Sequence, residues 1–163
     1  MDVSDGMVAQ YNERMQRDEI NATAVRGNLL VDTVDSSLDE HTGFDVAFVG
    51  LGFHHFSDSK KCLIRLRERV KAGGVVVILD WLPSDGGHHS HGHESEGKED
   101  EFKHMRHTIA HNGFDEDMMG SLYQEAGLEN FNFVVMGEPV RLVMGEKEVK
   151  KMPFLARGQA PQR

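Results

Sequence analysis

The sequence predicts an α/β protein in which helices cover a mostly parallel sheet. Two observations favour this class. Apolar, β-branched segments at 44–51 and 75–81 alternate along the chain with segments of helical spacing. The segment VVVILDW at 75–81 is an uninterrupted apolar run, which is typical of a strand buried on both faces of a parallel sheet. Ligands of such sheets bind beyond the carboxyl ends of the strands, so functional residues are expected there.

The first elements follow from spacing and end signals. A helix is predicted over 5–17, where apolar and aromatic side chains recur at helical intervals. Ser4 or Asp5 is its expected N-cap. Residues 22–31 predict a short strand that Gly27 interrupts.

Between the two strong strands the pattern is helical. Residues 57–71 predict a helix with Ser57 or Asp58 as its N-cap. The pair Gly73 and Gly74 is expected to end it, because glycine is common just beyond the last turn of a helix.

The C-terminal half continues the alternation. Two helices are predicted over 102–112 and 115–126, the second beginning at Asp115 and ending at Gly127. Residues 130–136 alternate as a strand, and further strands are expected within 139–146 and 152–157.

Length, charge and cysteine content narrow the function classes. The 163 residues suit one domain, and 39% of them are hydrophobic. A net charge of −9 argues against nucleic acid and anionic membranes as partners. The single cysteine, Cys62, allows no internal disulfide and no Cys-rich zinc site. No apolar run reaches about 20 residues, and the N-terminus does not resemble a signal peptide, so a cytoplasmic protein is expected.

Residues 85–101 differ in composition from the rest. They contain no aliphatic or aromatic side chain, and they carry four histidines and six acids against one lysine. This composition is typical of a solvated loop. The histidines could bind a transition metal, but a functional site needs a defined ligand set that a loop of this kind does not supply. The prediction is therefore no metal site.

Several landmarks together carry a family resemblance. Asp2 stands before Ser4-Asp5-Gly6-Met7, the segment FDVAFVGLGFHHF spans 44–56, and RVKAGGVVVILD spans 69–80. In this order and spacing the chain resembles the class I S-adenosylmethionine-dependent methyltransferases, in their small-molecule branch. The resemblance implies a Rossmann-like sheet and a single methyltransferase domain over 1–157, with an insertion at 85–101 and a tail at 158–163.

The resemblance also implies cofactor-binding residues. Asp2 matches the acid that accepts hydrogen bonds from the ribose hydroxyls of S-adenosylmethionine, and Val3 would pack on adenine. Asn28, followed by Leu29, falls where the family reads the adenine amino group. Two alternatives stay open: Asp2 could instead cap the following helix, and Asn28 could simply form a turn.

Residues of the 44–56 segment would lie nearest the reaction. By resemblance, Gly50 and Leu51 end a strand that lines the methyl donor. His54 and His55 are the catalytic candidates, because a histidine can take a proton from a hydroxyl or amine substrate. A structural histidine paired with the backbone is the alternative. His107 and His111 are expected to line the substrate approach.

One element of the family is not found. Its glycine-rich cofactor loop and first strand, which is central in the sheet, would precede Asp2. The expected sheet therefore lacks its central strand, and an incomplete sheet would favour a homo-oligomer or a partner subunit.

The predicted activity is methyl transfer to a small-molecule, secondary-metabolite acceptor. The alternatives are a non-catalytic remnant or partner-binding subunit of methyltransferase origin, and a His-rich metal-binding protein.

Overall fold

A computed structural model describes residues 1–31, 41–83, 110–144 and 147–162. Contacts between Cα atoms divide the chain into two compact units, Met1–Thr42 and Gly43–Arg163, and each is described by itself. The predicted helix over 102–112 falls mostly outside the described residues, and its last residues, 110–112, are not helical. The His-rich segment 85–101 also lies outside them.

The N-terminal unit is built on helix α1 (Asp5–Arg17), as the spacing predicts. Ser4 is its N-cap, and its Oγ accepts a hydrogen bond from the Met7 backbone N–H. The Asn12 side chain both donates to and accepts from the backbone of Ala24, at 3.0 and 2.7 Å, which ties the returning chain to the helix. The strand expected over 22–31 is reduced to one parallel bridge between Asp2 and Arg26.

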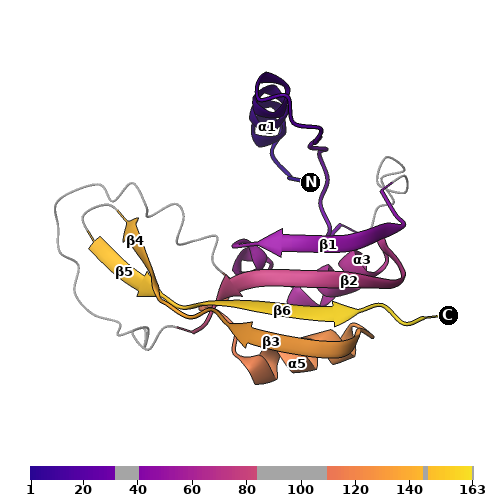
Figure 1. Cartoon of the computed structure of the whole chain (residues 1–163), viewed down its shortest axis with the longest axis vertical. Coiled ribbons are helices and arrows are strands. Elements are labelled where there is room, and N and C mark those ends of the chain that lie inside the picture. Colours follow the sequence, from indigo (N-terminus) through magenta and orange to yellow (C-terminus); the bar gives the residue numbers. More distant parts are fainter. Residues whose placement is uncertain (32–40, 84–109, 145–146, 163) are drawn as a thin grey trace. The chain divides into compact units, whose positions relative to one another are not determined.

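The second unit contains a four-stranded sheet in the order β1-β2-β6-β3 (Figure 1). Its strands are β1 (Phe44–Gly50), β2 (Val70–Trp81), β6 (Pro153–Gln159) and β3 (Glu129–Val135). Strand β1 is parallel to β2, whereas β6 is antiparallel to both β2 and β3. Three of the four strands therefore share one direction, which confirms the mostly parallel sheet. No described strand pairs with the outer edge of β1, and the missing central strand stays a prediction.

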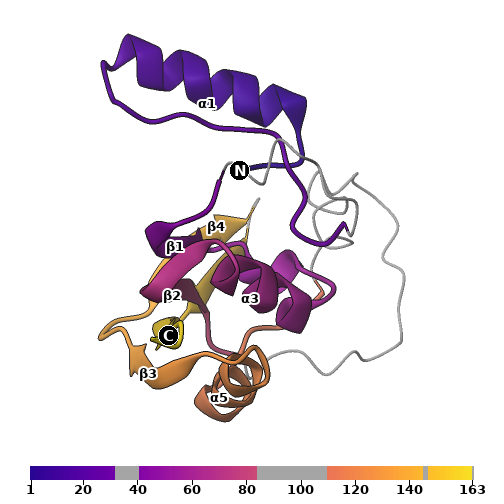
Figure 2. The same ribbon diagram turned by 90° about the vertical axis from the view of Figure 1, so that its right-hand side faces the viewer.

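Two helices, α3 (Ser59–Arg67) and α5 (Glu116–Glu125), cover one face of this sheet (Figure 2). Alternate residues of β2 point toward them, so Val76 and Ile78 are fully buried while their neighbours are half-buried. The largest buried side chains of this core are Phe53, Leu63, Phe114, Met119, Tyr123 and Phe154. A hairpin of β4 (Val140–Met144) and β5 (Lys147–Lys151) forms a separate two-stranded sheet.

The predicted end of the 57–71 helix was wrong. Helix α3 stops at Arg67, and β2 begins at Val70. The glycine pair belongs to the strand instead. Gly73 has a φ of 74°, and a Cβ on Gly74 would lie 3.0 Å from the Phe44 carbonyl oxygen of the neighbouring strand. These glycines therefore allow a turn and a close approach of β1 rather than a helix cap.

The tail expected over 158–163 was wrong at its start. Strand β6 continues to Gln159, and the Ala160 N–H donates to the Gly74 carbonyl at 2.8 Å. The strand predicted within 152–157 therefore extends two residues further, because the backbone of the polar pair Gly158 and Gln159 continues the pairing with β2.

Gly158 offers a packing test of this sheet. A Cβ there would lie against the Tyr123 ring and 3.1 Å from Leu128 Cβ, in a filled core. We expect Gly158→Ala to lower the free energy of unfolding by about 1–3 kcal/mol, as overpacking does. Gly137→Ala is the control, because nothing lies within 4 Å of its added Cβ. Urea denaturation measures both, and equal midpoints would contradict the packing described for Tyr123.

The buried thiol of Cys62 predicts that the free energy of unfolding depends on pH. Burial, with a smaller contribution from the charge of Asp58, raises the pKa of the Cys62 thiol to about 12 from an ordinary 9.0. Between these values the unfolded chain loses the proton and the folded chain keeps it, so the free energy of unfolding falls as pH rises. One such group can lower the free energy of unfolding by up to about 1.4 kcal/mol for each pH unit in this range.

The measurement is urea denaturation at pH 8 and pH 10.5 for the wild type and Cys62→Ala. The wild type should lose more stability over this interval than the variant does. An equal loss in both proteins would show that the thiol titrates alike in the folded and unfolded states.

Candidate active site

The candidate site lies at the carboxyl ends of β1 and β2. Gly50 pairs with Leu79, and the Leu51 N–H donates to the Leu79 carbonyl at 2.8 Å. Leu51 then adopts a φ of 55°, a left-handed conformation that is rare for a branched side chain. Backbone strain of this kind clusters at ligand-binding sites. The sharp turn leads directly into the short 3₁₀ helix η1 (Phe53–His55).

A buried carboxylate at the end of β2 organises this turn. Asp80 is 0% exposed. Its Oδ1 lies 2.7 Å from His54 Nδ1 and accepts the Trp81 N–H at 2.8 Å, while Oδ2 accepts the His54 N–H at 3.0 Å. Burying a carboxylate costs free energy unless it is hydrogen-bonded, and these contacts give each of its oxygens at least one hydrogen-bond partner.

The Asp80 contact selects the tautomer of His54. Opposite an ionised carboxylate, which only accepts hydrogen bonds, a neutral imidazole carries its hydrogen on Nδ1 and keeps a lone pair on Nε2. The His54 side chain is 13% exposed, which leaves it in partial reach of solvent. A histidine held in this way can accept a proton at Nε2.

The backbone around His54 is also fixed. Its carbonyl accepts the N–H groups of Ala110 and His111, at 3.0 and 3.1 Å. The preceding residue, Phe53, is fully buried and packs its ring 5.1 Å from that of Phe114. The Asp80 carboxylate, the N–H groups of Ala110 and His111, and the packing of the neighbouring Phe53 ring therefore hold His54 in place. The predicted residue His111 lies beside it.

His55 differs from its neighbour. Its ring centroid lies 4.2 Å from that of His54, and the residue is exposed. In the second unit the structure thus brings Gly50, Leu51, His54 and His111 to one edge of the sheet, with His55 at its surface. His107 lies outside the described residues.

The other predicted cofactor residues belong to the N-terminal unit. The Asp2 carbonyl accepts the Gly27 N–H at 2.9 Å, which places Asp2 and Val3 beside Asn28 and Leu29. Asp2 Oδ1 also accepts the Ser4 N–H at 2.8 Å, just before α1 begins. Asn28 Oδ1 accepts the Leu30 N–H at 2.9 Å, as a turn-forming asparagine does.

Asp80 is not among the site residues that the sequence predicted. A signal was present, because Asp80 is the one charged residue in the apolar run 75–81. A carboxylate inside a buried strand needs partners, and such a group is often functional. Its partner could not be read from the chain, since His54 lies 26 residues away.

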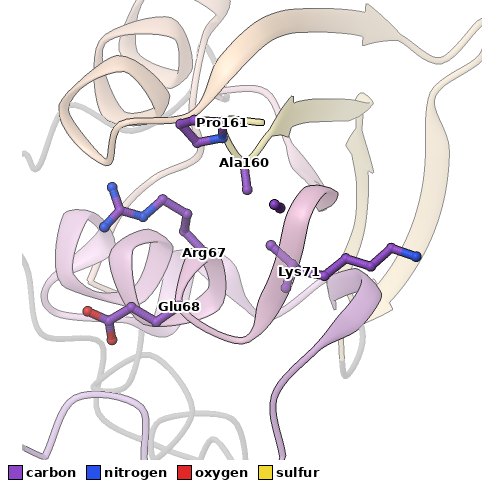
Figure 3. Close-up of a pocket in the computed structure, with 7 residues that line it drawn as sticks. Arg67, Glu68, Lys71, Ala160 and Pro161 are labelled. Carbon is purple, nitrogen blue, oxygen red and sulfur yellow. The ribbon is translucent and has the colours of Figure 1, made fainter. Parts of the chain in front are cut away.

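A hollow of about 510 Å³ lies near the opposite, amino end of β2 (Figure 3). Its charged groups are already engaged. Arg67 Nη1 donates to the Ala126 carbonyl at 2.8 Å, and Lys71 pairs with Asp45. The Lys71 ammonium and the Glu68 carboxylate point away from the hollow in Figure 3. The first contact joins α3 to the end of α5 and the second joins β2 to β1, so both side chains serve the fold rather than a ligand.

Within the described parts of the chain, no group of three or more His, Cys, Asp or Glu side chains could hold a metal ion. No helix in the same parts is long and apolar enough to cross a membrane.

Comparison with known proteins identifies the fold of the chain. No protein-family model matches the chain, and no curated protein matches its sequence. Solved structures do match. YcgJ of Bacillus subtilis has a TM-score of 0.66 at 12% identity, covering 99% of this chain and 81% of that one.

Two further matches name an activity. An S-adenosylmethionine-dependent methyltransferase of Aquifex aeolicus has a TM-score of 0.55 at 15% identity, covering 96% of this chain and 65% of that one. Phosphoethanolamine N-methyltransferase 2 of Haemonchus contortus, with phosphomonomethylethanolamine and S-adenosylhomocysteine bound, has a TM-score of 0.63 at 15% identity. That match covers 99% of this chain and 43% of the other. The chain thus has the fold of S-adenosylmethionine-dependent methyltransferases, which confirms the predicted resemblance at the level of fold.

Asp80 gives a test of the site. Asp80→Ala leaves two partly buried backbone N–H groups and His54 Nδ1 without their acceptor, so the free energy of unfolding should fall by about 2–4 kcal/mol. The ¹⁵N shifts of the His54 ring should move from the Nδ1–H pattern to a mixture of tautomers. Asp45→Ala is the control: it removes an exposed ion pair with Lys71, so it should lower the free energy of unfolding far less than Asp80→Ala does and leave the His54 spectrum unchanged. An unchanged His54 spectrum in Asp80→Ala would refute the tautomer assignment.

Proposed function

We propose that this chain is an S-adenosylmethionine-dependent methyltransferase that acts on a small-molecule acceptor. The observation that carries the proposal is the His54–Asp80 pair, 2.7 Å between Nδ1 and Oδ1, at the carboxyl edge of the sheet. Ligands of α/β sheets bind at this edge. The likeness to methyltransferase structures supports the proposal independently. A secondary-metabolite acceptor stays a prediction.

His54 is the proposed proton acceptor. When bound, S-adenosylmethionine supplies the methyl group. The acceptor's hydroxyl or amine gives up its proton, and His54 Nε2 takes it while Asp80 stabilises the resulting imidazolium. General-base catalysis of this kind contributes about 10²- to 10⁴-fold to a rate. His55, with its exposed ring against His54, is proposed to help hold the acceptor rather than to take the proton.

The residues of the N-terminal unit fit the ribose and adenine of this cofactor. The exposed Asp2 carboxylate uses one oxygen for the Ser4 N–H and keeps the other for a ribose hydroxyl. Asn28 Oδ1 already accepts the Leu30 N–H, but an amide oxygen has a second lone pair that can accept from an amino group. Val3 is 61% exposed and Leu29 is half-buried, so both side chains offer apolar surface next to Asp2 and Asn28.

Gly50 and Leu51 are proposed to line the methyl donor. Gly50 ends β1 without a side chain, which allows close backbone approach. The left-handed turn at Leu51 leaves its side chain 44% exposed.

Calorimetric titration of the full chain with S-adenosylhomocysteine tests the cofactor assignment. We expect saturable binding, and Asp2→Ala should weaken it about tenfold by removing a charge-assisted hydrogen bond. Asp5→Ala is the matched control, because Asp5 is an exposed acid of the same unit that pairs with Arg26. No binding at millimolar ligand would exclude the enzyme for this chain, and unchanged affinity in Asp2→Ala would refute the ribose assignment.

The role of His54 is tested by turnover. With any acceptor that yields S-adenosylhomocysteine, His54→Gln should lower kcat by at least about 100-fold, since glutamine cannot take the proton. Cofactor affinity should stay within about twofold of the wild type. A variant that keeps full kcat would show that positioning alone suffices.

The second candidate is a non-catalytic, partner-binding subunit. One observation favours it: Val46 and Phe48 of β1 are 54% and 57% exposed on the sheet face opposite α3 and α5. Apolar surface of this kind is typical of an interface. Sedimentation that shows a stable oligomer, together with no S-adenosylhomocysteine binding, would favour this candidate over the enzyme.

A further inference from the structure

The outer side of β1 is an unpaired edge of the four-stranded sheet (Figure 1). Strand β1 pairs with β2 on one side, and among the residues that the structure describes no strand pairs with its other side. The Leu51 N–H donates to the Leu79 carbonyl of β2. Backbone groups alternate in direction along a strand, so the N–H and C=O groups of Val46, Phe48 and Gly50 face outward.

This edge lacks the features that keep most sheet edges from pairing. Charged side chains, proline and β-bulges are the usual ones. The segment 46–50, VAFVG, has no charge and no proline, and its register with β2 is regular from Val46 onward. At the opposite edge, β3 carries the exposed Glu129, and its register with β6 shifts between Glu129 and Asn132. The described sheet therefore has one protected edge and one edge that can accept a further strand.

The outward groups of β1 determine what can bind there. A row of N–H and C=O groups is matched by the backbone of another extended strand. The side chains of Val46 and Phe48 are 54% and 57% exposed. Aromatic and β-branched side chains stabilise a sheet when they lie opposite each other on neighbouring strands. The matching strand therefore alternates such residues without charges among them, and β1 itself has this pattern.

We infer that β1 pairs antiparallel with β1 of a second copy of this chain. A two-fold axis beside Ala47 places Val46 opposite Phe48 of the second copy, and Phe48 opposite its Val46, so outward N–H and C=O groups meet. Each copy carries a net charge of −9, and the uncharged segment 46–50 brings no like charges into contact. Since each copy has one such edge, the pairing closes at a dimer. It does not rest on the proposed methyl transfer.

Sedimentation velocity of the full chain, from low to high micromolar concentration, tests the inference. Pairing through one strand is smaller than the about 1,200–2,000 Å² of a standard interface, so we expect a reversible dimer. Amide hydrogen exchange of Phe48 should slow as the dimer forms, because its N–H gains an acceptor. A chain that stays monomeric, or a dimer in which Phe48 exchanges as fast as in the monomer, would overturn the inference.

Two charge substitutions test the register. Val46→Lys and Phe48→Glu each replace one member of the aromatic–β-branched pair, so each should raise the dissociation constant of the dimer about tenfold. An equimolar mixture of the two variants should dimerise to within about threefold of the wild type, because opposite charges then face each other across the strands. A mixture that associates no better than either variant alone would contradict the pairing.

Val143→Glu is the matched control. Val143 is 77% exposed but lies in the separate β4–β5 hairpin, so a charge there should leave the dissociation constant unchanged. Urea denaturation checks folding, and all three variants should keep midpoints near that of the wild type, because the substituted side chains are exposed. Equal weakening of the dimer by Val143→Glu and Phe48→Glu would show a general charge effect and overturn the assignment to β1.

Titration of the wild type with S-adenosylhomocysteine separates this inference from the proposed function. Dimerisation without cofactor binding would keep the strand pairing and exclude the methyltransferase for this chain. Cofactor binding by a chain that stays monomeric would do the reverse.

Discussion

The second unit depends at its functional edge on one constraint: a carboxylate buried in an apolar core must be hydrogen-bonded. Asp80 meets this requirement with the backbone and ring of His54 and the N–H of Trp81. The same contacts fix the path of η1, the orientation of one imidazole and the position of the segment that leads to His111. Stability and chemistry therefore share the same atoms there, so a substitution cannot remove one without disturbing the other.

The two faces of the sheet differ in how far they are buried. Helices α3 and α5 bury one face around Tyr123, whose hydroxyl donates to the Ala156 carbonyl at 3.2 Å. On the other face Val46, Phe48 and Val134 stay largely exposed. The buried face supports the candidate site, and the exposed face has the character of a surface that another element or chain covers. A methyltransferase and a partner-binding subunit thus draw on different faces of one sheet.

Local signals predicted much of the fold. Helix α1 and its cap at Ser4, strand β1 and the span of α5 all follow from spacing and end residues. The end of α3 was missed because Val70 already pairs with Phe44 of β1, and such pairing is not visible in local sequence. For the site, histidines 54 and 55 and the strand end at 50–51 were selected. Asp80 was not, because its role depends on a contact between distant segments.

The order of the strands affects how the chain can fold. Strand β6 follows β3 in the chain, yet it lies between β2 and β3 in the sheet. During synthesis β3 emerges with no neighbour to pair with, and it waits until residues 153–159 have left the ribosome. The central ladder therefore closes after translation of the last strand, through contacts distant in sequence, which is a slow class of folding event. Until then the backbone N–H and C=O groups on the β6 side of β2 lack strand partners, and an open strand edge of this kind favours aggregation of a nascent chain.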